Sequence, residues 1–321
     1  MTTRSRTGAA AFGDALVRTF GPARARSRVA LAPLTTFKVG GPADWLLELH
    51  GHRELHVALE LAAAAGVPVT VLGGGSNVLV GDRGVRGLVV RVRGGAVTPV
   101  TPGAVRADAG VTLNGLVRWT IARGLAGLEM WAGTPGTVGG AIYGNAHFQG
   151  RLIGERVVRA AVVSRAGTMT ELVRAEMAFA YDDSRLQHTG EILLWADFAV
   201  EPGEPARLRD IARAALRYRK HTQPLALPSA GCIFKNPDPA RVPLPSDVPP
   251  SAGALIDRAG MKGAALGGAL VSPAHANFIV NAGGATARDV RQLIQRCKRA
   301  VRDRFGIELE EEIVYLGDWE G

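Results

Sequence analysis

The chain of 321 residues is long enough for two domains, or for one domain with two lobes, and its 47% hydrophobic and 21% charged residues are typical of globular proteins. No apolar run reaches the length of about 18 residues that a membrane helix needs, and the arginine-rich N-terminus lacks the apolar core of a secretory signal. The net charge of +9 is spread along the chain without a motif of stacking aromatic residues, which favours an anionic ligand over nucleic acid.

The first third of the chain predicts several strands and helices in alternation. Residues 10–21 predict a short amphipathic helix ahead of the main fold, and residues 36–50 predict a strand, a glycine turn and a second strand. Apolar positions at helical spacing predict a helix over 54–67 that ends near Gly66. Residues 68–80 then predict a strand, a tight glycine turn and a strand, and residues 87–92 predict another strand.

The middle of the chain predicts a short strand at 106–110 and a helix from about 113 to 123, which Gly124 ends. A second glycine-rich segment, WAGTPGTVGGAIYGNA, follows at 131–146, and strands are predicted at 157–167 and 191–200. The helix predicted at 204–221 marks a boundary near residue 205.

The last third predicts a proline-rich surface loop at 238–253, then a helix, strands, a long helix that begins at Thr286, and a final strand. Short strands and helices mix throughout without regular βαβ repeats, which predicts an α+β fold rather than a doubly wound sheet. Cys232 and Cys297 lie far apart and form no CxxC pair, which predicts neither a zinc knuckle nor a disulfide framework and indicates a reducing compartment, the cytoplasm.

The two glycine-rich segments each follow an apolar strand. Neither is followed by the Gly-Lys-Ser/Thr of a phosphate-binding P-loop, and neither has the pattern of a Rossmann nucleotide site. Tight glycine turns can present backbone N–H groups to an anion, and Ser76, Asn77, Thr134 and Thr137 add polar side chains. Either segment alone could be an ordinary turn, but the two together predict a long ligand with a diphosphate.

Seven stretches resemble, in the same order, the UDP-N-acetylenolpyruvoylglucosamine reductase family. They are TTFKVGGPAD, LGGGSNVLV, GLEMWAGTPGTVGGAIYGNA, PSAGCIFKNP, SAGALIDRAGMKG, SPAHANFIVN and FGIELEEEIVYLG, across residues 34–317. The resemblance implies a two-lobed FAD-binding domain like that of vanillyl-alcohol oxidase at 34–204, and a smaller α+β substrate-binding domain at 205–321. A partly helical extension precedes them at 1–33, and the short interval from Tyr181 to Tyr218 resembles the type II branch.

The resemblance implies FAD and NADPH as cofactors and a UDP-sugar as substrate, in a cytoplasmic monomer that makes peptidoglycan precursors without nucleic acid, membrane or metal. NADPH would reduce FAD, and hydride would then pass to the enolpyruvyl group of the substrate. The residues implied to hold FAD are Gly73, Gly74, Gly75, Ser76 and Asn77 around the pyrophosphate, and Pro135, Gly136, Thr137, Val138, Gly139, Gly140, Gly144 and Asn145 beside the flavin.

Two residues are implied to complete the reduction. Cys232 stands where most members have a serine proton donor, and a thiol of ordinary pKa, about 8.5, is largely protonated at neutral pH. Glu312 matches a C-terminal glutamate that stabilises or protonates the enolate, although Glu310, Glu311 and Glu312 could also be one solvated acidic run. Strand alternation places Glu310 and Glu312 on one face and cannot separate them. Cys232 could likewise be a buried structural cysteine.

One departure from the family stands at Asp182. Members usually carry an arginine after the tyrosine of a Y-R-x-S motif, where it contacts the substrate carboxylate and the flavin, but here Tyr181 is followed by Asp182. An acidic group there would repel an anionic enolate. Arg185, three positions on and on the same face of a helical turn, is one candidate replacement and a candidate catalytic residue; another arginine or an altered chemistry is equally open.

The remaining candidates concern the substrate. Tyr181, Lys235 and Asn236 match substrate-binding positions, whereas Arg217 and Lys220 are expected on the phosphate side because a diphosphate needs cations. His275 and Asn277 are expected to be structural. Two alternatives remain: an FAD-dependent oxidoreductase of the same fold with a different substrate, which Asp182 favours, and a homologue that binds a nucleotide-sugar without turnover.

Overall fold

The computed structural model describes residues 3–319, with side chains for 11–51 and 54–319. By contacts between Cα atoms the chain divides into two compact units, whose limits run across the predicted domain boundaries. Unit 1 comprises Met1–Val29, Ala43–Gly74 and Arg86–Arg217, and unit 2 comprises Ala30–Pro42, Gly75–Val85 and Tyr218–Gly321. Each unit is described by itself.

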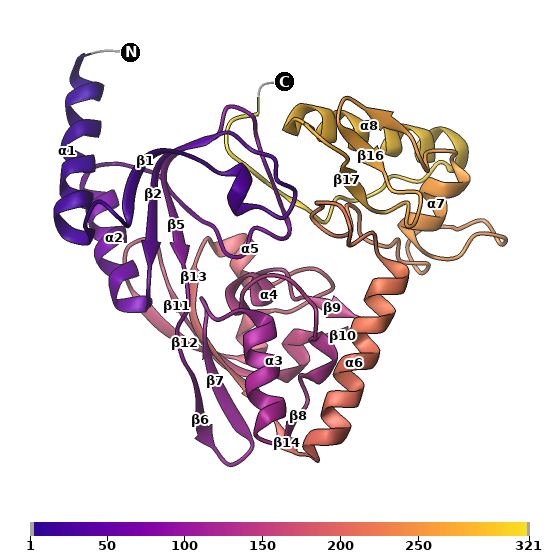
Figure 1. Cartoon of the computed structure of the whole chain (residues 1–321), viewed down its shortest axis with the longest axis horizontal. Coiled ribbons are helices and arrows are strands. Elements are labelled where there is room, and N and C mark those ends of the chain that lie inside the picture. The colour runs from indigo at the N-terminus through magenta and orange to yellow at the C-terminus, as the bar shows by residue number, and fades with distance from the viewer. Residues whose placement is uncertain (1–2, 320–321) are drawn as a thin grey trace. The chain divides into compact units, whose positions relative to one another are not determined.

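One sheet of unit 1 has four strands in the order β1 (Ala25–Ala30), β2 (Pro42–Leu49), β5 (Val85–Val92) and β3 (Val69–Val71). Helices α1 (Thr3–Phe20) and α2 (His52–Ala64) contact each other beside this sheet (Figure 1). Their apolar faces bury Leu16 and Leu59 against Leu47 and Leu88 of the strands. The sheet and the two helices therefore form one layered lobe.

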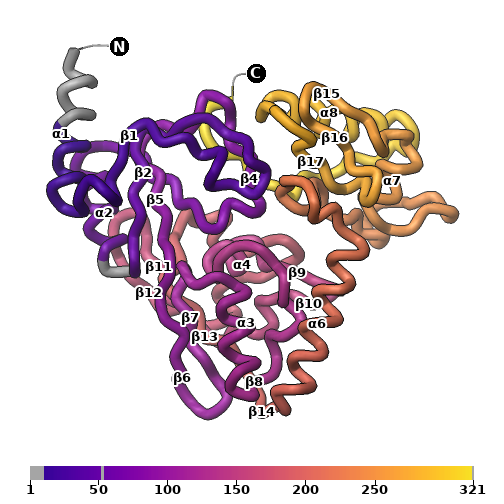
Figure 2. Tube along the Cα trace, viewed as in Figure 1, coloured from indigo at the N-terminus to yellow at the C-terminus, as the bar shows by residue number. Residues whose placement is uncertain are grey.

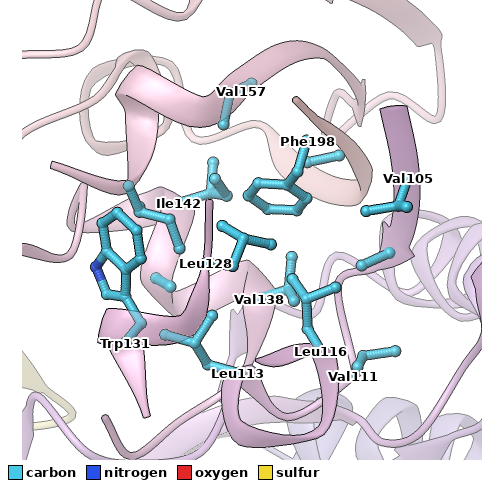
Figure 3. Close-up of a cluster of buried hydrophobic side chains, with 14 of the residues drawn as sticks. Val105, Val111, Leu113, Leu116, Leu128, Trp131, Val138, Ile142, Val157 and Phe198 are labelled. Atoms are coloured by element: carbon cyan, nitrogen blue, oxygen red, sulfur yellow. The ribbon is translucent and has the colours of Figure 1, made fainter. Parts of the chain in front are cut away.

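The second sheet of unit 1 has five strands and is antiparallel throughout. Its order is β12 (Met169–Val173), β11 (Val157–Val163), β13 (Ile192–Ala199), β7 (Ala104–Asp108) and β6 (Val97–Thr101). Helices α3 (Leu113–Ala122) and α4 (Val138–Tyr143) pack on one side of it, and their side chains meet Phe198 in the core that Figure 3 shows.

The central strand β13 is buried on both faces. Its residues Ala196 and Phe198 join the core of α3 and α4, whereas Leu194 and Trp195 join the core of the four-stranded lobe. The pairing of β13 with β11 shifts register between Trp195 and Leu193, and this irregularity changes which side chains of the strand face each core. Strand β13 therefore stands between the two cores of unit 1. Asp197, near the end of this strand, is only 2% exposed.

Short elements complete unit 1. They are β8 (Leu125–Ala126) paired with β14 (Glu201–Pro202), β9 (His147–Phe148) paired with β10 (Arg151–Leu152), helix α5 (Arg185–Thr189), and the 3₁₀ turns Glu129–Trp131, Ile153–Arg156 and Arg174–Met177. Helix α6 (Pro205–Thr222) runs from unit 1 into the start of unit 2.

Unit 2 is built on a three-stranded antiparallel sheet, β15 (Ala265–Leu266), β16 (Ala269–Val271) and β17 (Ile279–Asn281), with α7 (Ala252–Arg258) and the long α8 (Ala287–Phe305). A 3₁₀ turn, Ala32–Leu34, and β4 (Val78–Val80) come from the N-terminal stretches. Strand β4 pairs in parallel with β18 (Val314–Leu316), so that early and late parts of the chain share one small sheet (Figure 2).

The α+β class is confirmed, and most predicted elements form. Helix α8 begins at the predicted cap: the Thr286 hydroxyl accepts a hydrogen bond from Asp289 N at 3.0 Å. One prediction is wrong, because residues 36–41 form no strand. Lys38 has φ +57° and Gly40 has φ +134°, which break an extended backbone. The Thr35 hydroxyl donates a hydrogen bond to the carbonyl of Val39 at 3.1 Å, which closes this loop.

Candidate active site

The first glycine segment leaves strand β3 with unpaired amides. The backbone N–H groups of Gly73 and Gly74 donate to no atom within residues 3–319, although both residues are partly exposed. A methyl group on Gly74 would come within 2.5 Å of Cα of Gly136, and one on Gly73 within 2.8 Å of the Thr137 hydroxyl. The two glycine segments therefore touch inside unit 1, at a spacing that only glycine permits in the first of them.

The second glycine segment differs, because the chain itself uses its amides. Val138 N donates to Val111 O at 2.8 Å and Gly139 N to Ala109 O at 2.9 Å. Thr137 caps α4 by accepting from Gly140 N at 3.3 Å. This segment supplies a packed wall, and the first segment supplies the free donors.

This arrangement fits FAD. A dinucleotide needs donors for its pyrophosphate, which the amides of Gly73 and Gly74 offer in a turn, and the facing wall at Gly136 leaves no room for side chains. Asn145, also predicted to contact FAD, is fully buried, and its amide links Ala180 O at 2.6 Å with Gly154 N at 2.9 Å. A contact of Asn145 with the cofactor stays a prediction.

In unit 2 the segment that carries Cys232 lies beside the one that carries Glu312. Phe234 pairs antiparallel with Glu311, Glu312 N donates to Ile233 O at 2.8 Å, and Lys235 N donates to Glu310 O at 2.9 Å. The carbonyl of Glu312 accepts from Asn77 Nδ2 at 3.2 Å. The two paired segments thus carry three predicted site residues, Cys232, Lys235 and Glu312. A fourth, Asn77, contacts them through the carbonyl of Glu312.

The three consecutive glutamates have separate surroundings. Glu310 is 81% exposed and lies 4.0 Å from Lys235 Nζ. Glu311 is held by Lys298 Nζ at 2.9 Å and by the Tyr315 hydroxyl at 2.5 Å, and burial and Glu311 raise the pKa of Tyr315. Glu312 is half-buried. The acidic run is therefore not uniformly solvated, and Glu311 is the structural member.

Other predicted substrate residues are spread over the two units. Arg217 and Lys220 are exposed near the end of α6, and the Asn236 side chain accepts from Ala252 N at 3.0 Å, at the start of α7. Asn277 is buried and binds both backbone groups of Phe234, at 3.0 and 2.8 Å. Asn277 thus fixes the Cys232 segment, which confirms its structural assignment.

The departure at Asp182 has a clear local structure in unit 1. Asp182 Oδ1 lies 2.8 Å from Nδ1 of His147, and the aspartate is 6% exposed. Tyr181 is 40% exposed. Arg185 forms two hydrogen bonds with Glu191, at 2.8 and 3.3 Å. A contact of Arg185 with substrate stays a prediction, and it would require this ion pair to open.

Comparison with known proteins identifies the family. A family model described as UDP-N-acetylenolpyruvoylglucosamine reductase, C-terminal domain, matches residues 223–316, and one described as FAD binding domain matches residues 43–172. UDP-N-acetylenolpyruvoylglucosamine reductase 2 of Symbiobacterium thermophilum is 42% identical over 297 residues, which cover 92% of this chain and 93% of that protein. The chain belongs to the UDP-N-acetylenolpyruvoylglucosamine reductase family.

Further members of the reductase family agree. The reductase of Rubrobacter xylanophilus is 42% identical over 289 residues, 88% of this chain and 92% of its own length. Among solved structures, the reductase of Thermus caldophilus superposes with a TM-score of 0.75 at 34% identity, covering 91% of this chain and 99% of that one. The two-part fold predicted from the motifs is therefore the fold of the reductase family. In the part of the chain that the structure describes, no helix is long and apolar enough to cross a membrane.

In this reductase family member, sequence reasoning missed Arg219. It is 7% exposed, and burial lowers the pKa of its guanidinium to about 10, while a thiolate at Cys232 would raise that pKa. The signal was present: Leu208, Ala212 and Ala215 form the buried stripe of α6, and Arg219 is the next position of that stripe. A charged residue in line with buried apolar residues indicates a buried charge. The structure places this charge close enough to Cys232 for the two groups to interact.

Proposed function

We propose that this chain reduces UDP-N-acetylglucosamine enolpyruvate to UDP-N-acetylmuramate, with NADPH as reductant and FAD as bound cofactor. It acts as a cytoplasmic monomer in the synthesis of peptidoglycan precursors and binds the UDP-sugar rather than nucleic acid. The observation that carries the proposal is the pairing in unit 2 that sets the Cys232 segment against the Glu312 segment. Membership of the reductase family supports it.

The chain's residues would divide the work as follows. The amides of Gly73 and Gly74 hold the pyrophosphate of FAD, which supplies hydride transfer when it is bound. The Cys232 thiol holds the proton that the substrate carbon receives, and Glu312 stabilises the charge that develops on the enolate. The Arg219 guanidinium stabilises the thiolate that remains after the proton has left.

Purified protein tests this function through its absorption spectrum and its consumption of NADPH. Flavin bands, or uptake of added FAD, are expected, together with NADPH oxidation that depends on UDP-N-acetylglucosamine enolpyruvate. Oxidation without that substrate and with release of peroxide would favour an oxidoreductase with another substrate, which Asp182 suggests. FAD binding without turnover would favour a non-catalytic homologue, and a protein that takes up no flavin would refute the proposal.

Replacing Gly140 with alanine is expected to weaken FAD binding about tenfold without lowering the stability of the flavin-free chain, because alanine is the better helix former within α4. Gly140 is exposed on α4, and a methyl group there would lie 3.7 Å from the Thr137 hydroxyl, an ordinary contact. Any loss of affinity for FAD would therefore come from contact of the methyl group with the cofactor and not from strain within the chain.

Fluorescence titration with FAD and thermal unfolding of the flavin-free protein measure the two effects. Gly74→Ala is the contrasting variant, because its methyl group meets Gly136 and should lower both affinity and stability. An unchanged FAD affinity in Gly140→Ala would remove Gly140 from the cofactor site.

A further inference from the structure

The carboxylate of Glu311 is held by three side chains of unit 2, although the reaction scheme above does not use it. Its Oε1 accepts hydrogen bonds from Lys298 Nζ at 2.9 Å and from Gln295 Nε2 at 3.3 Å, and its Oε2 accepts from the Tyr315 hydroxyl at 2.5 Å. The Glu311 side chain is 17% exposed, compared with 81% for Glu310. A carboxylate that binds a cation and two neutral donors is fixed in one orientation.

The three donors belong to elements that are well anchored in unit 2. Gln295 and Lys298 lie three positions apart on α8 and share one face of it, while Ile294 and other buried residues of this helix pack into the core of the unit. Burial, followed by the bond to Glu311, raises the pKa of Tyr315 in β18, so the Tyr315 hydroxyl keeps the proton that it donates. Glu311 is thus tied both to the long helix and to the last strand.

The stretch that carries Glu311 has little regular structure of its own. Among the residues that the structure describes, the stretch between the end of α8 at Phe305 and the start of β18 at Val314 has one strand pairing, the bridge of Glu311 with Phe234. A stretch with so few backbone bonds opens locally at a low cost in free energy unless its side chains anchor it. The anchors at Glu311 therefore determine how precisely the next residue is placed.

The next residue is Glu312, to which the proposed function gives the stabilisation of the enolate. Its backbone N–H donates to Ile233 O at 2.8 Å, and its carbonyl accepts from Asn77 Nδ2 at 3.2 Å. Because neighbouring Cα atoms are only about 3.8 Å apart, a shift of Glu311 passes directly to Glu312. A misplacement of about 1 Å at a reacting group can slow a reaction by about 10²-fold.

We propose that Glu311 is a positioning residue, which acts through its ion pair with Lys298 of α8 to hold Glu312 where the enolate forms. The inference rests on the proposed function, because Glu312 has this role only in the reduction of the UDP-sugar. Glu311 acts through Glu312 and makes no contact with the substrate in this scheme. Its loss should therefore slow the step in which the enolate forms and leave the binding of the substrate unchanged.

Glu311→Gln tests the proposal in the FAD-loaded protein, because it removes the charge that binds Lys298 and keeps the size of the side chain. In stopped flow, bleaching of the flavin by NADPH should keep its rate. Recovery of the flavin absorbance with UDP-N-acetylglucosamine enolpyruvate should slow by about 10–10²-fold. The substrate concentration that gives half of the maximal recovery rate should stay within about twofold of that of the unaltered protein.

Variants of the partner keep the proposal testable if Glu311→Gln does not fold. Lys298 is 26% exposed, and methionine is a good helix former, so Lys298→Met should fold. It should slow the recovery of the flavin as Glu311→Gln does, whereas Lys298→Arg keeps the positive charge and should recover most of the rate. Because both positions act through one ion pair, the double variant Glu311→Gln, Lys298→Met should be no slower than the slower single variant.

Glu308→Gln is the matched control, because Glu308 lies in the same stretch and pairs with Arg302 of the same helix at 3.5 Å, but is 63% exposed. It should leave both half-reactions unchanged.

Several results would overturn the proposal. They are an equal slowing of both half-reactions in Glu311→Gln, a loss of thermal stability without slower recovery of the flavin, and a recovery in Lys298→Arg as slow as in Lys298→Met. The first two are the signatures of a purely structural role. If the unaltered protein is bleached by NADPH and does not recover with the UDP-sugar, the proposed function itself fails, and the inference about Glu311 falls with it.

Discussion

Replacing Cys232 with alanine is expected to lower kcat by about 10²–10⁴-fold, because the variant lacks the side chain proposed to protonate the substrate carbon. With NADPH and substrate both present, the flavin absorbance should stay bleached. Cys232→Ser should keep substantial activity, since a hydroxyl can also donate a proton. Steady-state NADPH consumption and stopped-flow absorbance measure both effects.

Cys297 provides the control for this prediction. It is the other cysteine of the chain, it is 1% exposed within α8, and burial raises the pKa of its thiol to about 12. Cys297→Ala should therefore leave kcat unchanged, whatever it costs in stability. An unaltered turnover in Cys232→Ala would end the assignment of Cys232 as the proton donor.

Replacing Asp197 with asparagine is expected to lower the free energy of unfolding by about 2–3 kcal/mol at pH 7. The buried carboxylate accepts from Arg106 at 2.7 and 3.0 Å and from Arg159 at 2.7 Å, across two strand pairs of the five-stranded sheet. Both arginines are partly exposed, so the loss should stay below that of a fully buried ion pair. Urea unfolding with saturating FAD measures it.

The effect of Asp197 should depend on pH. Burial alone raises the pKa of Asp197, but hydrogen bonds and charges from Arg106 and Arg159 outweigh it and lower the net pKa below the usual value. The carboxylate therefore stabilises the fold above its unfolded pKa of about 3.9, and this stability is lost as the pH falls through the lower folded value. The gap between the parent and Asp197→Asn should be constant above about pH 5 and narrow below pH 4.

Asp210 provides the surface control. It is 72% exposed and pairs with Arg213 at 3.0 Å. Asp210→Asn should change the free energy of unfolding by less than about 0.5 kcal/mol. A loss in Asp197→Asn no larger than this, or one that persists unchanged at pH 3, would contradict the role given to the Asp197 carboxylate.

Helices and strands were predicted well where their signals lie close together in the sequence. The helix from Leu113 and the cap at Thr286 depend on residues within one or two turns, which a sequence displays directly. The α8 cap also shows the limit of such signals. The Asp82 carboxylate accepts from Ala287 N at 2.8 Å and Arg288 N at 3.0 Å, from a position 205 residues earlier in the chain. No pattern in the sequence around Asp82 predicts this contact.

The candidate site divides in the same way. Cys232, Glu312 and the glycine turns could be found because they lie in short motifs whose order resembles that of the family. The pairing of His147 with Asp182 could not be predicted, because the tertiary fold alone brings these residues together. The alternatives that the sequence left open were Arg185, another arginine or an altered chemistry. The unpaired amides of Gly73 and the engaged amides of Gly139 also look alike as sequence. Only the hydrogen-bond partners in the structure show that the amides of the first glycine segment are open to a ligand, whereas those of the second are used within the chain.

The composition of unit 2 determines when it can fold during synthesis. Phe37 and Leu79 belong to the same apolar core as Ile294 and Ile313, and β4 has β18 as its partner. On the ribosome, the N-terminal stretches emerge long before the residues that cover them, whereas unit 1 is complete once Arg217 has been added. A nascent chain stalled soon after Arg217 has emerged would therefore carry a finished unit 1 and expose Phe37 and Leu79 to chaperones.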